Sequence, residues 1–179
     1  YYAFLSEEVG VEDLLLDYIQ YAFSQQKKVD KDYSHPSILK IAQIAKSVGR
    51  EKHRMEAFVR FRLTKDDIYF ASTEPDFNVL PLIEKHFKRR YADQKWVIYD
   101  IKRGYGLFYD LEKVELINMD FPENFNFTKT DDAFFATQEF EFQKLWQDYF
   151  KATNIASRKN MKLHIRHVPK RYWKYLNEK

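Results

Sequence analysis

Hydrophobic positions recur with a helical period in four segments of the chain. Residues 11–26 repeat apolar side chains every three to four positions and carry acids in the first turn, which predicts an amphipathic helix. Residues 35–58 have a proline at their second position and continue as an apolar stripe, which predicts a second helix that could break at Gly49. The same spacing predicts helices over 78–91 and 139–152.

The last of these helices has a strongly apolar side. Large side chains recur along it at helical spacing, and burial in a core is the usual reason for such a stripe. We therefore expect the following side chains to be core: Phe142, Leu145, Trp146, Tyr149 and Phe150.

Elsewhere the period changes to two, which predicts strands. The stretches FVRFRL, residues 58–63, and IYFAST, residues 68–73, flank the four-residue hairpin signal TKDD. Three more strand candidates lie at 95–101, 106–111 and 113–119. Because their connections are very short, these three strands must be antiparallel neighbours.

The order of these elements predicts the fold class. Strands that run together between flanking helices, without βαβ alternation, indicate an α+β fold. We expect a mainly antiparallel sheet of about five strands with helices packed on one face. Residues 120–136 look irregular, and 169–176 predict a short terminal helical segment. With 179 residues, four glycines and five prolines, the chain predicts a single domain over residues 1–179.

Composition narrows the chemistry. The chain is 45% hydrophobic and 18% aromatic, well above a disordered chain. It has no cysteine, which excludes disulfides, thiolate metal sites and cysteine nucleophiles and fits a reducing, cytoplasmic location. No apolar run approaches the roughly 20 residues that cross a bilayer, so we expect no membrane association.

The net charge of +3 is mild, but the charges are segregated. Acids dominate residues 1–26 and 110–148, whereas positive side chains collect in 50–62, 85–95 and 158–174. Segregated positive charge favours a polyanionic partner more than the net value does.

The strand candidate 58–63 offers a specific site for such a partner. In an extended chain, Phe58, Arg60 and Arg62 share one face. Two guanidiniums beside an aromatic ring suit phosphate contact and base stacking, which single-stranded nucleic acid offers. The alternative is a solvated outer face whose arginines pair with acids on neighbouring strands.

Two further basic segments allow both interpretations. Arg90 on the helix over 78–91 suits an anion contact or a basic last helical turn that faces water. The C-terminal segment interleaves basic residues with Tyr172, Trp173 and Tyr175, which suits backbone contact and stacking. As an alternative, the aromatic residues anchor this segment to the core while the basic residues face water. We expect Trp173 and Leu176 to be core in either case.

Candidates for acid–base chemistry are few. Four side chains could serve as acid, base or ligand: Glu74 and Asp76 in a loop after a strand, and His53 and His86 on predicted helices. The chain has no HExxH or DxDxDG motif, so we expect no metal. It also has no GxGxxG, GxxxxGK[ST] or GxSxG motif, so we expect no cofactor.

Several short motifs resemble a known family. They are GREKHRM running into FVRFR, then EPD, HFKRR, WVIYD with Arg103 after it, RKN and PKRYW. This set resembles a bacterial family of uncharacterised "probable DNA metabolism proteins". The resemblance implies a role near DNA repair or modification, beside a radical-SAM protein thought to act on DNA. Some members are fused to a uracil-DNA glycosylase-like domain. It also implies that this chain lacks the family's first strand and helix.

These observations lead to one expected function and two alternatives. We expect an accessory DNA-binding protein of a DNA repair or modification system that holds the phosphate backbone through an arginine-rich surface. The contributing side chains would be Arg54, Arg60, Arg62, Arg90, Arg103, Arg158 and Arg171. The alternatives are an enzyme acting on DNA or a nucleotide through the His/Glu/Asp candidates, or a docking module for a radical-SAM partner.

Overall fold

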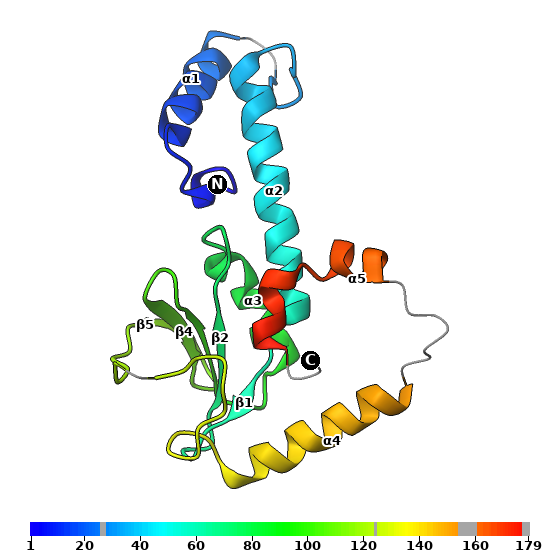
Figure 1. Ribbon diagram of the computed structural model, residues 1–179. Coiled ribbons are helices and arrows are strands. Elements are labelled where there is room, and N and C mark those ends of the chain that lie inside the picture. Colours follow the sequence, from blue (N-terminus) through cyan, green and yellow to red (C-terminus); the bar gives the residue numbers. More distant parts are fainter. Residues whose placement is uncertain (26–27, 124, 154–160, 177–179) are drawn as a thin grey trace. The chain divides into compact units, whose positions relative to one another are not determined.

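A mixed five-stranded sheet and several helices make up the fold, as the computed structural model of residues 1–25, 28–123, 125–153 and 161–176 shows (Figure 1). The elements in chain order are η1 (Phe4–Ser6), α1 (Val11–Ser24), α2 (Pro36–Phe58), β1 (Arg62–Leu63), β2 (Tyr69–Thr73), α3 (Leu80–Arg90), β3 (Trp96–Asp100), β4 (Tyr105–Tyr109), β5 (Val114–Ile117), α4 (Thr137–Thr153), α5 (Met161–His167) and η3 (Lys170–Tyr175).

The chain divides into two compact units. Unit 1 comprises Tyr1–Glu56 and Pro75–Ile83, and unit 2 comprises Ala57–Glu74 and Glu84–Lys179. The chain therefore passes between the units three times. That residues 1–179 act as a single domain stays a prediction.

Unit 1 contains the two long helices that the sequence predicts. The helix α2 runs from Pro36 through Phe58 without a break at Gly49, so the possible interruption there was wrong. Its apolar stripe, which includes Val48 and Met55, is buried, and this burial outweighs the weak helix propensity of one glycine. Glu51 is also buried and accepts a 3.1 Å hydrogen bond from the backbone N–H of Asp76.

Unit 2 contains the sheet, whose strands lie in the order β1-β2-β3-β4-β5. Neighbours are antiparallel except β2 and β3, which are parallel and are joined through α3. The hairpin between β1 and β2 and the antiparallel order of the last three strands are confirmed. The predicted α+β class with a mainly antiparallel five-stranded sheet is confirmed as well.

The first strand is much shorter than the sequence predicts. Only Arg62 and Leu63 pair with β2, because α2 continues through Phe58. Arg60 Nη1 then donates a 2.7 Å hydrogen bond to the carbonyl oxygen of Ala57 in the last turn of that helix. The predicted extended face over 58–63 is therefore wrong.

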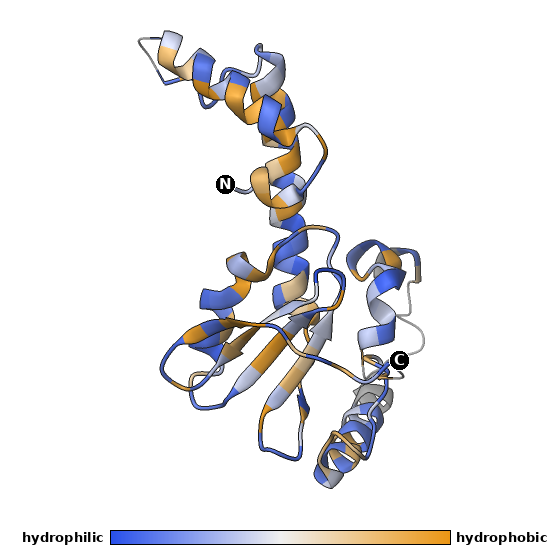
Figure 2. Cartoon of the chain, turned by 90° about the vertical axis from the view of Figure 1, so that its left-hand side faces the viewer, coloured by the Kyte–Doolittle hydropathy of each residue, from blue (hydrophilic) through white to orange (hydrophobic). Residues whose placement is uncertain are grey.

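Different elements cover the two faces of the sheet. On one face, Trp96 of β3 contacts the rings of Phe61, Phe87 of α3 and Tyr109 of β4. On the other face, Phe70, Val97 and Tyr99 form a core with Phe135. The irregular segment that precedes α4 adds more rings there: Phe121, Phe127 and Phe134. Figure 2 shows hydrophobic residues along the strands of the sheet, and also along the helices of unit 1.

The helix α4 forms where predicted, but its apolar side is not core. The expected core side chains that the structure describes are largely exposed: Phe142 58%, Leu145 65%, Trp146 44% and Tyr149 59%. The side chain of Phe150 lies outside the described part of the structure. Both faces of the sheet are already covered by α3 and by the irregular aromatic segment, which leaves this helix at the margin.

None of the helices in the described residues combines the length and the apolar character that crossing a bilayer requires.

Candidate nucleic-acid interface

A groove of about 780 Å³ opens within unit 2, between the end of α3, the approach to β1 and the exposed side of α4. Its lining comprises Val59, Arg60, Phe61, Tyr69, Arg90, Tyr91, Gln94, Glu139, Phe142, Gln143, Leu145, Trp146 and Tyr149. This volume lies in the usual range of ligand sites, about 300–1,000 Å³. Two arginines and six aromatic side chains thus share one concave surface.

The two arginines come from elements far apart in the sequence. Arg60 is half-buried, and the carbonyl oxygens of Ala57 and Val59 hold its Nη1 at 2.7 and 3.3 Å. Arg90 is exposed in the last turn of α3, with its guanidinium carbon 5.7 Å from the centre of the Tyr91 ring. The groove therefore brings these two arginines to one surface.

The aromatic wall beneath the arginines is rigidly packed. Phe61 makes edge contacts with Phe87 and Tyr91, at centroid distances of 5.7 and 5.2 Å. Phe87 is buried, so these contacts fix the ring of Phe61 against the core.

The opposite wall consists of exposed side chains of α4. Trp146 and Tyr149 lie three residues apart on one side of the helix, with ring centroids 5.7 Å apart and an interplanar angle of 31°. Sequence patterning assigned these rings to the core, so it missed them as site residues. One sequence feature could have indicated their exposure. The chain is 18% aromatic, which is more large aromatic side chains than one small sheet can bury.

Amides and one carboxylate add polar groups to the lining. Glu139 is buried and accepts a 2.8 Å hydrogen bond from the backbone N–H of Leu63, which ties α4 to β1. Gln143 Nε2 donates to Glu139 Oε1 at 2.9 Å and to Thr130 Oγ1 at 2.6 Å. Gln94 lies on the other side, near Tyr91.

Arg62 does not face outward, and the prediction that it does is wrong. Its side chain is buried, with the residue 5% exposed. Nη1 and Nη2 donate hydrogen bonds of 2.7 and 2.8 Å to the carbonyl oxygens of Lys129 and Phe127, and the guanidinium lies 4.3 Å from the centre of the Phe135 ring. Burial lowers the pKa of Arg62 to about 10, partly opposed by Glu139, so the group is charged at neutral pH.

The other predicted arginines occupy separate environments. Arg103 Nη1 lies 2.8 Å from the buried carboxylate of Asp100. In unit 1, Arg54 lies 3.5 Å from Glu51. Arg171 packs over the ring of Tyr172 at 4.7 Å. Arg158 lies outside the described residues. A nucleic-acid role for the accessible members of this set stays a prediction.

The four acid–base candidates are divided between the units. His53 and Asp76 belong to unit 1, where His53 is largely exposed and lies 3.9 Å from Glu56. His86 and Glu74 belong to unit 2, where the ring of His86 contacts Phe87. Throughout the described ranges, no three histidine or carboxylate side chains form a group that could hold a metal ion.

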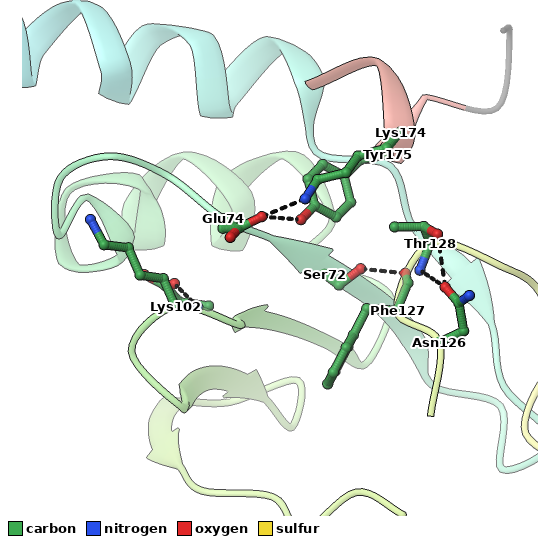
Figure 3. A network of polar contacts seen from close by, with 9 residues as sticks. Ser72, Glu74, Lys102, Asn126, Phe127, Thr128, Lys174 and Tyr175 are labelled. Atoms are coloured by element: carbon green, nitrogen blue, oxygen red, sulfur yellow. Dashed lines mark hydrogen bonds and ion pairs between the residues drawn. The ribbon is translucent and has the colours of Figure 1, made fainter. Parts of the chain in front are cut away.

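Glu74 instead belongs to a hydrogen-bonded network at the end of β2 (Figure 3). Its Oε2 accepts hydrogen bonds from Lys174 Nζ at 2.6 Å and from the hydroxyl of Tyr175 at 2.8 Å. These two bonds lower the pKa of Glu74. Burial is the main cause that raises the pKa of Tyr175 to about 12, so its phenol remains a donor.

A smaller pocket of about 420 Å³ adjoins this network and is lined in part by Phe125, Phe127 and Asn126. Asn126 Oδ1 already accepts hydrogen bonds from the backbone N–H and the hydroxyl of Thr128. Ser72 donates to the carbonyl oxygen of Phe127 at 2.8 Å. These bonds hold the irregular segment against β2, which indicates a structural role for the network.

Comparison with known proteins gives one match. No curated protein and no solved structure matches the chain. A family model described as a domain of unknown function, DUF4130, matches residues 9–178. The predicted resemblance to an uncharacterised family is confirmed at this level. The match covers nearly the whole sequence, and the chain therefore belongs to the DUF4130 family.

Proposed function

We propose that the protein is an accessory DNA-binding protein of a DNA repair or modification system, which holds phosphate groups at the groove through Arg60 and Arg90. The observation that carries this proposal is the convergence of these two arginines in one aromatic-lined groove. The radical-SAM protein and the uracil-DNA glycosylase-like domain that the resemblance implies are proposed partners. A cytoplasmic location belongs to the same proposal.

Guanidinium chemistry supports a phosphate ligand. Arginine presents planar, always charged donors that match phosphate oxygens in pairs. The last turn of α3 adds Lys88 and Arg89 to Arg90, which increases the positive potential at this end of the helix. The one acid in the groove lining, Glu139, is buried and already bonded to Leu63 and Gln143. It therefore offers little competition for the arginines.

A salt-titrated binding assay tests this function. Fluorescence anisotropy of a labelled oligonucleotide should give an affinity that falls steeply with added salt, because counterions are released from each neutralised phosphate. The double variant R60Q/R90Q should weaken binding and reduce the slope of log K against log salt by about 1.4–1.8, at roughly 0.7–0.9 for each lost phosphate contact.

Arg89→Gln is the matched control, since Arg89 is exposed on the same helical turn but does not line the groove. It should change the affinity much less than Arg90→Gln. Binding that is weak and insensitive to salt would refute the proposal, as would equal losses in the two variants.

The exposed apolar side of α4 favours a second candidate, a protein-docking module. In that case a radical-SAM partner should be retained on the immobilised protein after nuclease treatment. Loss of the partner upon nuclease treatment would indicate DNA bridging instead. No comparable observation among the described residues favours the enzyme alternative.

A further inference from the structure

We propose that the groove receives an unpaired nucleobase, stacked against Trp146 and Tyr149, so that the bound DNA is single-stranded or locally unpaired. This inference rests on the proposed function and specifies its ligand.

The aromatic rings are the first argument for an unpaired base. In a duplex, each base is covered on both faces by its neighbours, so an aromatic side chain can stack on a base only where the strand is open. Trp146 and Tyr149 are 44% and 59% exposed, which leaves ring surface available to a ligand. Their neighbouring positions on one helix side provide a continuous stacking surface.

The charge arrangement is the second argument. Arg60 and Arg90 line the same groove as these rings, so one nucleotide can place its base on the aromatic surface and its phosphate near a guanidinium. An apolar peptide would use the rings but would desolvate two charged guanidiniums without offering them an anion, which is costly. The combination of rings and cations therefore favours a nucleotide over an apolar segment.

Gln143 supplies the third argument. Its amide orientation is fixed, because the carboxylate of Glu139 only accepts hydrogen bonds and must face the amide nitrogen. Both hydrogens of Nε2 are then used by Glu139 and Thr130, and the side-chain carbonyl oxygen remains as an acceptor. Gln94 lies in the same lining and carries both a donor and an acceptor. These amides can pair with the exposed edge of a base, which a duplex would hide.

The experiment compares three probes of equal length on the full chain: a single-stranded oligonucleotide, its duplex and an abasic single strand. Anisotropy gives the affinities, and tryptophan fluorescence reports stacking. The change W146F identifies the signal of Trp146 above the background of the buried Trp96 and of Trp173. We expect the single strand to bind most tightly, with quenching that W146F removes.

The double variant W146A/Y149A should lower the affinity for the single strand by roughly 5- to 150-fold for each stacked base. It should leave the weaker binding of the duplex and the abasic strand unchanged. Phe140→Ala is the control, because Phe140 is exposed on α4 but does not line the groove. Thermal unfolding of each variant verifies that these surface changes preserve the fold.

Two outcomes would overturn the inference. The first leaves the proposed DNA-binding function intact, and the second refutes that function as well. Salt-sensitive binding that depends on Arg60 and Arg90 but is equal for all three probes, without a Trp146 signal, refutes base stacking and leaves the proposed function intact. An absence of salt-sensitive binding to every probe refutes both. Quenching of Trp146 by an apolar peptide in that second case would identify a protein ligand.

Discussion

Arg62 Nη1 donates a 2.7 Å hydrogen bond to the carbonyl oxygen of Lys129, 67 residues further along the chain. A second bond, from Nη2 to Phe127, fixes the same segment. One side chain of the shortest strand thus fastens the irregular aromatic segment over the sheet. The basic stretch 50–62 therefore contributes to the architecture as well as to the groove.

Replacing Arg62 by methionine should destabilise the fold. The carbonyl oxygen of Lys129 would lose its guanidinium donor, and that of Phe127 would keep only the hydroxyl of Ser72. The variant therefore loses two hydrogen bonds to a charged group, at about 1.5–3 kcal/mol each. Urea unfolding followed by circular dichroism measures the change. Arg89→Gln on the exposed turn of α3 should leave the unfolding midpoint nearly unchanged. Equal stability of R62M and wild type would show that these bonds contribute nothing.

Two glycines should respond to alanine in opposite ways. A Cβ at Gly106 would lie 2.9 Å from the carbonyl oxygen of Ile98 and 3.1 Å from a ring carbon of Tyr99, so G106A should cost about 1–3 kcal/mol. A Cβ at Gly49 would meet only the ring of Tyr2, at 3.8 Å, so G49A should stabilise α2 by about 0.5–1 kcal/mol. Melting temperatures of the two variants provide the measurement. Changes of the same sign would contradict the packing described for β4 or for α2.

The pair formed by Arg103 and Asp100 should show strong coupling. Asp100 is fully buried, and R103M would leave its carboxylate without the guanidinium, at a cost of about 3 kcal/mol. The double variant D100N/R103M should lose less than the sum of the single variants, because it removes the uncompensated charge. Additive losses in denaturant unfolding would rule out this coupling.

The same pair predicts a pH dependence. Burial raises the pKa of Asp100, and the hydrogen bonds from Arg103 oppose this rise. In R103M the rise should be larger, so the folded state should favour the protonated acid. A raised carboxyl pKa contributes stability below its unfolded value, which is lost as the pH rises through the folded value. The deficit of R103M should therefore be smallest near pH 4, at about the ordinary pKa of aspartate, and should grow toward neutral pH.

Glu74 should behave in the opposite sense. Hydrogen bonds from Lys174 and then Tyr175 lower the pKa of Glu74, so its stabilising contribution is present above its ordinary pKa and is lost as the pH falls through the lowered value. E74Q should cost less than about 1 kcal/mol at pH 7, because the pair is 51% and 42% exposed. The difference from wild type should vanish in strong acid. Glu123→Gln, an exposed acid in the same pocket lining, is the control and should show little change at either pH.

Local patterns predict the elements of this protein better than their packing. The stripes of α1 and α2, the turn over residues 64–67 and the antiparallel order of the last three strands all follow from local periodicity and short connections. The parallel pairing of β2 and β3 does not, because it depends on where α3 returns the chain.

The candidate site likewise combines features that local sequence predicts with contacts that it does not. Arg60 and Arg90 are recognisable as cations in basic stretches, but their convergence depends on the late start of β1 at Arg62. Arg62 points inward because its guanidinium donates hydrogen bonds to the carbonyl oxygens of Phe127 and Lys129. A local sequence pattern cannot predict partners so distant along the chain. The stripe on α4 is indistinguishable from a core stripe until the sheet is known to be covered already.

The interleaving of the two units along the chain restricts how this family can be cut or recombined. A truncation after Glu56 would remove Pro75–Ile83 from unit 1. The buried carboxylate of Glu51 would then lose the hydrogen bond that the backbone N–H of Asp76 donates to it. Neither unit can therefore be exchanged as one continuous gene segment. An experiment that alters one unit therefore requires substitutions within the full chain.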